Sequence, residues 1–181
     1  MDKEFNNLLF HRHSIRKYKD TPVEAESVKQ IIEAGLLAPS SKSTRPWQFV
    51  IVEDKDVLDS LAKCKSAGAK PIANAAFAIV ICTDPEKSDV YIEDSSVAAT
   101  MMQLQATALG VGSCWIQIRN RYNSSDEPAQ NLIKEVLGIP DAYQIVQVLT
   151  FGISAEERKP VDPDKLLWEK VHIGSWTQSQ S

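Results

Sequence analysis

The sequence predicts an α+β domain in which helices pack against one mixed, mainly antiparallel sheet. Segments with strand composition mix with amphipathic helical segments, but without the strict alternation of a parallel α/β fold. The 181 residues suit one domain with a substantial core. No internal repeat or Gly/Ser-rich linker divides them. We therefore expect a single domain over residues 1–181.

Two helices are predicted before the first strand. Apolar residues at helical spacing predict the first helix over residues 3–11. The second is predicted to begin at Thr21 and Pro22, because threonine suits an N-cap and proline suits the first turn. It should end before Pro39, which cannot continue a helix. Residues 12–20, RHSIRKYKD, should be extended or irregular.

The next three segments read strand, helix, strand. Residues 48–53 are rich in β-branched and aromatic residues, which favours a strand. Residues 55–66 carry one apolar helical stripe. Residues 76–82, AFAIVIC, form a near-continuous apolar run, which predicts a central strand that is buried on both faces.

The helix predicted over residues 93–109 is unusual because most of its residues are small or apolar. A helix with so little polar surface is buried or lies against another subunit. Gly110 is a suitable C-cap. A strand over 112–118, a helix over 128–137 and a strand over 144–153 are predicted to follow.

The tail from residue 154 to residue 181 has few secondary-structure signals but many apolar residues. We expect it to pack on its own subunit or on a partner. The apolar side chains are those of Leu166, Leu167, Trp168, Val171, Ile173 and Trp176.

Charge and hydropathy exclude several classes of partner. The net charge of -4 and the pI of about 5.4 argue against general binding of nucleic acid or of an anionic membrane surface. The N-terminus lacks the apolar run of a signal peptide. No apolar run is long enough to span a bilayer. We expect a cytoplasmic protein without a membrane partner.

Cysteine and histidine spacing gives no metal site. The three cysteines form neither a disulfide framework nor a zinc pattern. Cys82 and Cys114 lie in apolar runs, so we expect buried, reduced thiols. His11 and His13 could form a pair of ligands, but His172 is the only other histidine and no suitably spaced ligand completes a site.

The segment RHSIRKY, residues 12–18, concentrates positive charge in an acidic chain. If it is extended, Arg12, Ser14 and Arg16 point to one side. Two guanidinium groups and a hydroxyl on one face would suit a phosphate. An exposed basic loop that pairs with acidic residues is the alternative.

The sequence excludes two nucleotide-binding motifs. It lacks GxxxxGK[ST], so it contains no P-loop. Gly110 and Gly112 begin a pattern like GxGxxG, but Trp115 interrupts it and a predicted helix precedes it, where a dinucleotide fold has a strand. No side chain stands out as a nucleophile, which fits an enzyme whose cofactor carries the chemistry.

Four motifs in order resemble the nitroreductase family of FMN-dependent oxidoreductases. They are RHSIRKY at 12–18, APSSKSTRPWQFVIV at 38–52, ALGVGSCWI at 108–116 and FGI at 151–153. The resemblance covers roughly residues 5–176. It implies an interlocked homodimer of α+β subunits, with the tail packed on the partner and two FMN sites at the interface.

The resemblance implies which residues bind the flavin. The segment that holds the phosphate and the ribityl chain corresponds to Arg12, His13, Ser14 and Arg16. The segment that places backbone N–H groups near the N5/O4 edge corresponds to Trp115, Ile116 and Gln117. A basic tail residue that assists the phosphate corresponds to Lys159, with Arg158 as the alternative.

A loop from the other subunit lines the flavin in this family, and it corresponds here to Pro39, Ser40 and Ser41. Many members read APSxxNxQPW, whereas this chain has Ser43 and Arg45 at the Asn and Gln positions. The smaller Ser43 leaves more room beside the ring. Arg45 either brings a cation near N1/O2, where it would stabilise a reduced anionic flavin, or faces solvent.

The implied activity is an NAD(P)H oxidoreductase with ping-pong kinetics. NADH or NADPH would pass a hydride to flavin N5, and a nitroaromatic, a quinone or a similar small acceptor would then be reduced. Solvent can supply protons, so no catalytic side chain is predicted. Three alternatives stay open: a sister flavin activity such as dehalogenation or dimethylbenzimidazole synthesis, a non-catalytic flavin-binding protein, and an interaction domain with an empty pocket.

Overall fold

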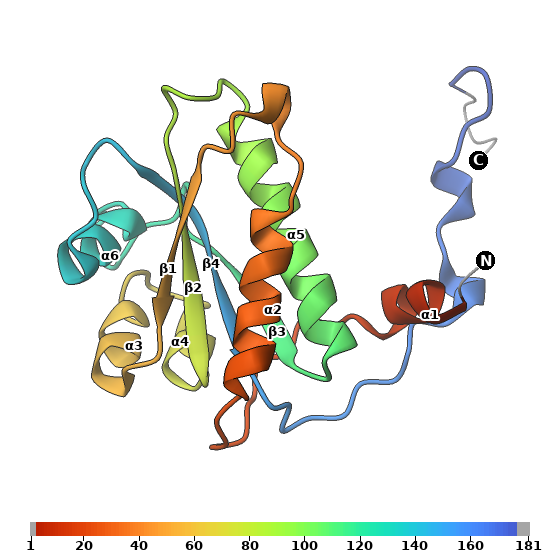
Figure 1. Cartoon of the computed structure of the whole chain (residues 1–181), viewed down its shortest axis with the longest axis horizontal. Coiled ribbons are helices and arrows are strands. Elements are labelled where there is room, and N and C mark those ends of the chain that lie inside the picture. The colour runs from red at the N-terminus through yellow and green to blue at the C-terminus, as the bar shows by residue number, and fades with distance from the viewer. Residues whose placement is uncertain (1–2, 177–181) are drawn as a thin grey trace.

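Four antiparallel strands form the centre of the computed structural model, which describes residues 3–176 (Figure 1). They are β1 (Trp47–Val52), β2 (Phe77–Thr83), β3 (Gly112–Gln117) and β4 (Gln144–Gly152). The spatial order is β1-β2-β4-β3, and all three neighbouring pairs are antiparallel. The predicted α+β class and the mainly antiparallel sheet are confirmed.

The two inner strands, β2 and β4, form the core of the sheet. All seven residues of β2 are buried, which confirms the central strand predicted from its continuous apolar run. In the pairing of β2 with β4, the rings of Phe77 and Phe151 stack with centroids 4.7 Å apart. This stacking adds to the hydrophobic stabilisation of the sheet.

Two long helices, α2 (Ala25–Leu36) and α5 (Tyr91–Ala108), cover one face of the sheet. Gly35 lies at their contact, where a Cβ atom would overlap the side chain of Met102. The buried stripe of α5 includes Ala98, Ala99, Met102 and Ala106. The unusual apolar helix is therefore, in large part, a core helix.

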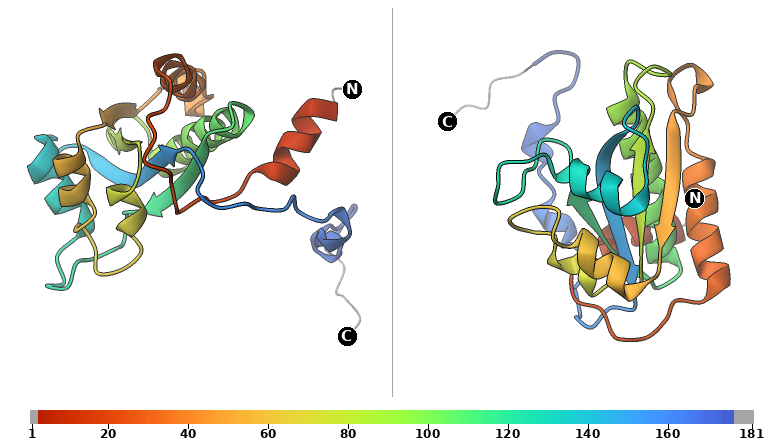
Figure 2. Two further views of the ribbon diagram at one scale, coloured as in Figure 1. Left: turned by 90° about the horizontal axis from the view of Figure 1, so that it is seen from below. Right: turned by 90° about the vertical axis from the view of Figure 1, so that its left-hand side faces the viewer.

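Three short helices cover the other face: α3 (Lys55–Leu61), α4 (Lys70–Ala73) and α6 (Ala129–Leu137). Figure 2 shows the sheet between the two helix layers. Helix α3 ends five residues earlier than predicted, because the chain turns after Leu61 to bury Cys64. Helix α4 was not predicted, since four residues carry too little periodicity.

The predicted start of the second helix is wrong. Helix α2 begins at Ala25, and Glu24 precedes it without a side-chain cap. Thr21 and Pro22 lie in irregular backbone before it. Val23 packs against the apolar cluster beneath α2 and α5, and this packing overrides the local helix-start signal.

The N-terminal helix α1 (Lys3–His11) and the tail lie together, away from the layered body (Figures 1 and 2). The Val161 N–H donates to the carbonyl oxygen of Phe10 at 2.9 Å. The tail carries two 3-10 turns, η2 (Pro163–Lys165) and η3 (Trp168–Lys170). The apolar side chains that the sequence predicts to pack are exposed in this chain, at Leu166, Leu167, Trp168, Val171, Ile173 and Trp176. None of the helices within residues 3–176 has the length and apolar character needed to cross a membrane.

Candidate functional site

The basic segment 12–18 forms no strand of its own, but isolated bridges at Ser14 and Tyr18 dock it on the edge of the sheet. The Ile15 N–H donates to the carbonyl oxygen of Ser113 on β3 at 2.8 Å. Lys17 and Lys19 form a short ladder with the chain that follows β4. In it, the Lys19 N–H donates to the Ile153 carbonyl at 2.8 Å, and the Ala155 N–H donates to the Lys17 carbonyl at 3.0 Å. The basic segment therefore takes its position from β3 and β4.

Two glycines provide the space for this docking. A Cβ atom on Gly112 would lie 2.9 Å from a methyl carbon of Ile15. A Cβ atom on Gly152 would lie 2.8 Å from the ring of Tyr18. Both distances are shorter than non-bonded carbons tolerate, so each position requires glycine if the basic segment is to keep its place.

Tyr18 anchors the segment from its far end. Its hydroxyl donates to the carbonyl oxygen of Ile15 at 2.7 Å and contacts the Thr150 hydroxyl at 2.8 Å. Burial raises the pKa of Tyr18 above the usual value, so the group stays neutral and keeps its proton for the hydrogen bond. Tyr18 therefore holds the basic segment in place, a structural role that the motif RHSIRKY did not indicate.

A cavity of about 240 Å³ lies where the segment meets the end of α5. It is lined by His11, His13, Ile15, Thr107, Gly110, Val111, Gly112, Ser113, Ser154, Glu156 and Arg158. Within residues 3–176, His13 Nε2 is buried without a hydrogen-bond partner. A buried ring nitrogen beside a cavity fits a polar ligand at this place.

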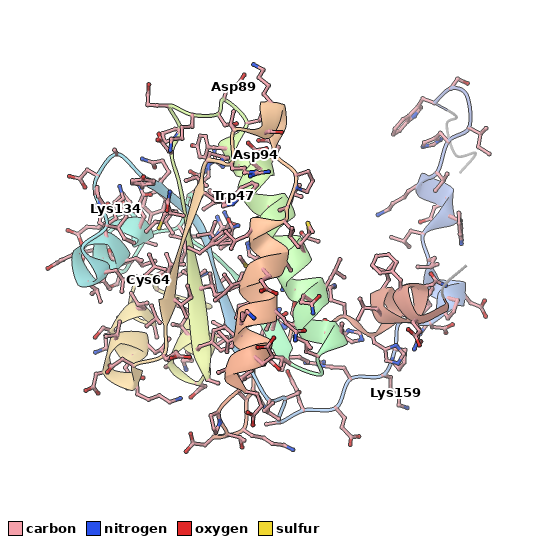
Figure 3. All side chains as sticks on the ribbon, in the orientation of Figure 1. Trp47, Cys64, Asp89, Asp94, Lys134 and Lys159 are labelled. Carbon is pink, nitrogen blue, oxygen red and sulfur yellow. The ribbon has the colours of Figure 1, made fainter. Side chains whose placement is uncertain are left out.

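Of the cations predicted to bind the phosphate, one lines this cavity and the others do not. Arg12, Ser14 and Arg16 alternate along the chain with three residues that line the cavity, and they do not line it themselves. Arg158 lines the cavity, whereas Lys159 is exposed on the segment that leads to the tail (Figure 3). Arg158 is therefore better placed beside the cavity than Lys159.

The basic segment already contacts a carboxylate of its own chain, that of Glu156. The carboxylate of Glu156 accepts a hydrogen bond from the Arg16 N–H at 3.1 Å and from the Arg158 guanidinium at 3.0 Å. The hydrogen bond from Arg16, with the charges of Arg158 and Lys17, lowers the pKa of Glu156. Within residues 3–176, the guanidinium groups of Arg12 and Arg16 form no salt bridge. These donors fit a phosphate such as that of FMN.

The loop predicted to line the flavin has an unusual backbone. Its 3-10 turn η1 (Ser41–Ser43) and the residues beside it include three non-glycine residues with positive φ: Lys42 at 51°, Ser43 at 56° and Arg45 at 46°. Such conformations cost about 1–3 kcal/mol each and persist only where other contacts impose them. The Arg45 N–H donates to Ser40 Oγ at 2.9 Å.

Asp94 connects this loop to the core. The Ser41 N–H donates to Asp94 Oδ1 at 2.8 Å. Asp94 lies near the start of α5, whereas Thr107 beside the cavity lies near its end. Thirteen residues of helix separate the two, which is about 20 Å. The loop and the basic segment of one chain therefore lie at opposite ends of α5. Figure 1 shows the loop beside the first turn of α5, and Figure 3 labels Asp94 at that end.

The third predicted segment lies on the edge strand β3. The Trp115 indole N–H donates to Gln117 Oε1 at 3.0 Å, and the Gln117 amide donates to the carbonyl oxygen of Arg119 at 3.0 Å. Ile116 is buried beneath them. Lys65, which the motifs did not indicate, donates from Nζ to the Gln117 carbonyl at 2.9 Å. Burial lowers the pKa of Lys65.

Helical periodicity could have indicated Asp94. It lies four and eight residues before Ala98 and Met102, so it shares their buried stripe. Tyr18 and Lys65 gave no such signal, because their partners are distant in sequence.

The cysteines are confirmed as buried free thiols. Burial raises the pKa values of Cys64 and Cys82 to about 11. In the part of the chain that the structure describes, no three His, Cys, Asp or Glu side chains lie close enough together to hold a metal ion.

Comparison with known proteins shows consistent similarity over the whole fold. The sequence model of the nitroreductase family matches residues 9–83 and 65–153. An Archaeoglobus fulgidus protein, named NADH dehydrogenase/NAD(P)H nitroreductase, is 30% identical over 96% of this chain and 99% of its own length. Among solved structures, an FMN-dependent nitroreductase from Clostridium difficile R20291 is 46% identical, with a TM-score of 0.91 over 94% of this chain and 99% of that one. A Bacteroides thetaiotaomicron protein, named NADH dehydrogenase/NAD(P)H nitroreductase, is 30% identical, with a TM-score of 0.87 over 97% of this chain and 100% of that one.

Proposed function

The chain belongs to the nitroreductase family, and on that premise we propose that it is an FMN-dependent NAD(P)H oxidoreductase that acts as a homodimer. One observation carries the proposal most directly. The basic segment 12–18 is fixed on the sheet edge while the guanidinium groups of Arg12 and Arg16 form no salt bridge within residues 3–176. Cations held in place in this way suit the phosphate of FMN.

The residues of the chain have distinct tasks in this proposal. Arg12, Ser14 and Arg16 bind the phosphate, with Arg158 or Lys159 from the tail. His13 offers its unpartnered Nε2 to the ribityl chain. The backbone of Trp115, Ile116 and Gln117 approaches the reactive edge of the ring.

FMN held by these residues would supply the hydride-transfer chemistry between NADH or NADPH and a small conjugated acceptor, such as a nitroaromatic or a quinone. The donor and the acceptor would use the same position in turn, which gives ping-pong kinetics. The task of the protein is to orient the ring, to exclude water and to stabilise negative charge at N1/O2.

Two features support a homodimer with shared sites. The loop of residues 40–45 and the basic segment lie at opposite ends of α5. A flavin that contacts both would therefore contact the loop of the partner subunit. Within residues 154–176, the tail also exposes seven large apolar side chains on its own subunit. Burying such a surface against a second copy would stabilise an obligate dimer.

The visible absorption spectrum of the purified protein tests this function. We expect flavin bands that bleach within seconds after anaerobic addition of NADH or NADPH and return when a quinone is added. Flavin bands that do not bleach would favour a non-catalytic flavin-binding protein. A protein that stays colourless after soaking in FMN would contradict the proposal and favour an interaction domain.

A further inference from the structure

Asp94 is an acidic side chain buried near the start of the long helix α5. It is only 5% exposed, and each of its two carboxylate oxygens accepts a hydrogen bond. Oδ1 accepts from the Ser41 N–H at 2.8 Å, and Oδ2 accepts from the Ser88 hydroxyl at 2.7 Å. Placing a carboxylate in the core is costly unless such bonds compensate, so this residue has a specific task.

That task concerns the loop of residues 40–45. In the described chain, every other hydrogen bond formed by these six residues stays within the loop. The bond from Ser41 to Asp94 is therefore the one that joins the loop to the rest of the protein.

The strain in the loop makes this bond more important. Lys42, Ser43 and Arg45 hold positive φ angles that they would leave if the loop were free to relax. The internal bonds of the loop preserve its local shape, but they cannot fix its position relative to the core. A single charged acceptor on a buried helix can fix that position.

We propose that Asp94 is a positioning residue for the flavin-facing loop and so governs how the ring end of FMN is held. This inference rests on the proposed function. Because the loop would reach the partner's flavin, Asp94 of one subunit acts on the site whose phosphate is bound by the other. Asp94 itself touches neither the cofactor nor the substrate.

Ring-end and phosphate-end effects can be separated with FMN and riboflavin, which lacks the phosphate. The variants are Asp94→Ala, Asp94→Asn and the matched control Ser95→Ala. Ser95 is fully buried in the same helix turn, and within residues 3–176 its hydroxyl donates only to the carbonyl oxygen of Ile92. Dissociation constants for both flavins are measured by fluorescence titration on the dimeric apoprotein.

Loss of a charge-assisted hydrogen bond should weaken binding by about tenfold to a hundredfold in Asp94→Ala. We expect the same factor for FMN and for riboflavin, because the loop faces the ring. Asp94→Asn keeps an acceptor for Ser41 and should retain most of the affinity, while Ser95→Ala should match the wild type. Once unbound FMN has been removed by gel filtration, the absorption maximum of the FMN that stays bound to Asp94→Ala should also lie closer to that of free FMN. An unfolded fraction, which holds no FMN, would not cause this shift.

If Asp94→Ala does not fold, Ser41→Pro decides the question from the loop side. It removes the same N–H donor at the first position of a 3-10 turn, where proline is tolerated. Equal affinities in the wild type, in Asp94→Ala and in Ser41→Pro would overturn the inference and leave the proposed function intact. A loss confined to FMN would also overturn it. A wild-type protein that binds neither flavin would overturn the proposed function itself.

Discussion

Replacing Tyr18 by phenylalanine should loosen the basic segment without changing its charge. The hydroxyl of Tyr18 joins the segment to itself at Ile15 and to β4 at Thr150, at 2.7 and 2.8 Å. The ring would stay against Gly152, so the packing is kept and the polar contacts alone are lost.

The magnitude follows from these two contacts. Each hydrogen bond contributes about 1 kcal/mol net, so the variant should lose about 2 kcal/mol in free energy of unfolding. For a chain of this length, that loss corresponds to a melting temperature about 4–8 °C lower. Because the segment is then less well ordered, FMN affinity should also fall, by about tenfold if half to all of the lost energy appears in binding.

Thermal unfolding and FMN titration measure the two effects. Tyr122→Phe is the control, since the side chain of Tyr122 is 48% exposed and its loss of a hydroxyl should be nearly neutral. The reasoning is refuted if Tyr18→Phe and Tyr122→Phe unfold at the same temperature and bind FMN equally well.

Three further predictions concern the phosphate site, the docking glycines and the thiols. Arg12→Ala and Arg16→Ala should each weaken FMN binding by about tenfold to a hundredfold and leave riboflavin binding unchanged. An unchanged FMN affinity in both variants would contradict the assignment of these residues to the phosphate. Gly112→Ala should lose about 1–3 kcal/mol of stability in urea unfolding, because its new methyl group overlaps the isoleucine packed there, and a wild-type midpoint would argue against that close contact. Burial raises the pKa values of Cys64 and Cys82 from 9.0 to about 11, so their contribution to stability is complete below pH 9.0 and lost as the pH rises toward 11. Urea midpoints that do not fall between pH 9 and pH 11 would contradict that burial.

Most of the fold could be predicted because its signals are local. The apolar run of β2 predicted the central strand, and Gly110 predicted the end of α5, where the structure gives it a positive φ angle. The start of α2 could not be predicted, because packing of Val23 competes there with an equally plausible local signal at Thr21. Local sequence patterns indicate the secondary structure that a segment favours. Where two local signals are of similar strength, tertiary packing determines which one is followed.

The candidate site was predictable in part for the same reason. The charge of Arg12 and Arg16 is visible in the sequence, and so is the lack of a helical pattern around them. The contacts that fix this segment join distant residues, such as Tyr18 and Thr150, which are 132 positions apart. The bond from Ser41 to Asp94 spans 53 positions. No pattern within one segment reveals such pairs.

A mixed dimer tests the central claim, that each FMN site is built from two chains. One subunit carries Ser41→Trp, which keeps the backbone bonds of Ser41 and blocks the loop face with a large ring. The other subunit carries both Arg12→Ala and Arg16→Ala. Homodimers of each variant, which should both lose tight FMN binding, are the controls.

The quantity to measure is the number of FMN molecules bound tightly per purified mixed dimer. If the sites are shared, one site combines both defects and the other combines two wild-type parts, so the mixed dimer should hold one FMN, half of the wild-type amount. If each site lies within a single chain, both sites carry a defect and no tightly bound FMN should remain. That second result would contradict the shared site and the account that depends on it.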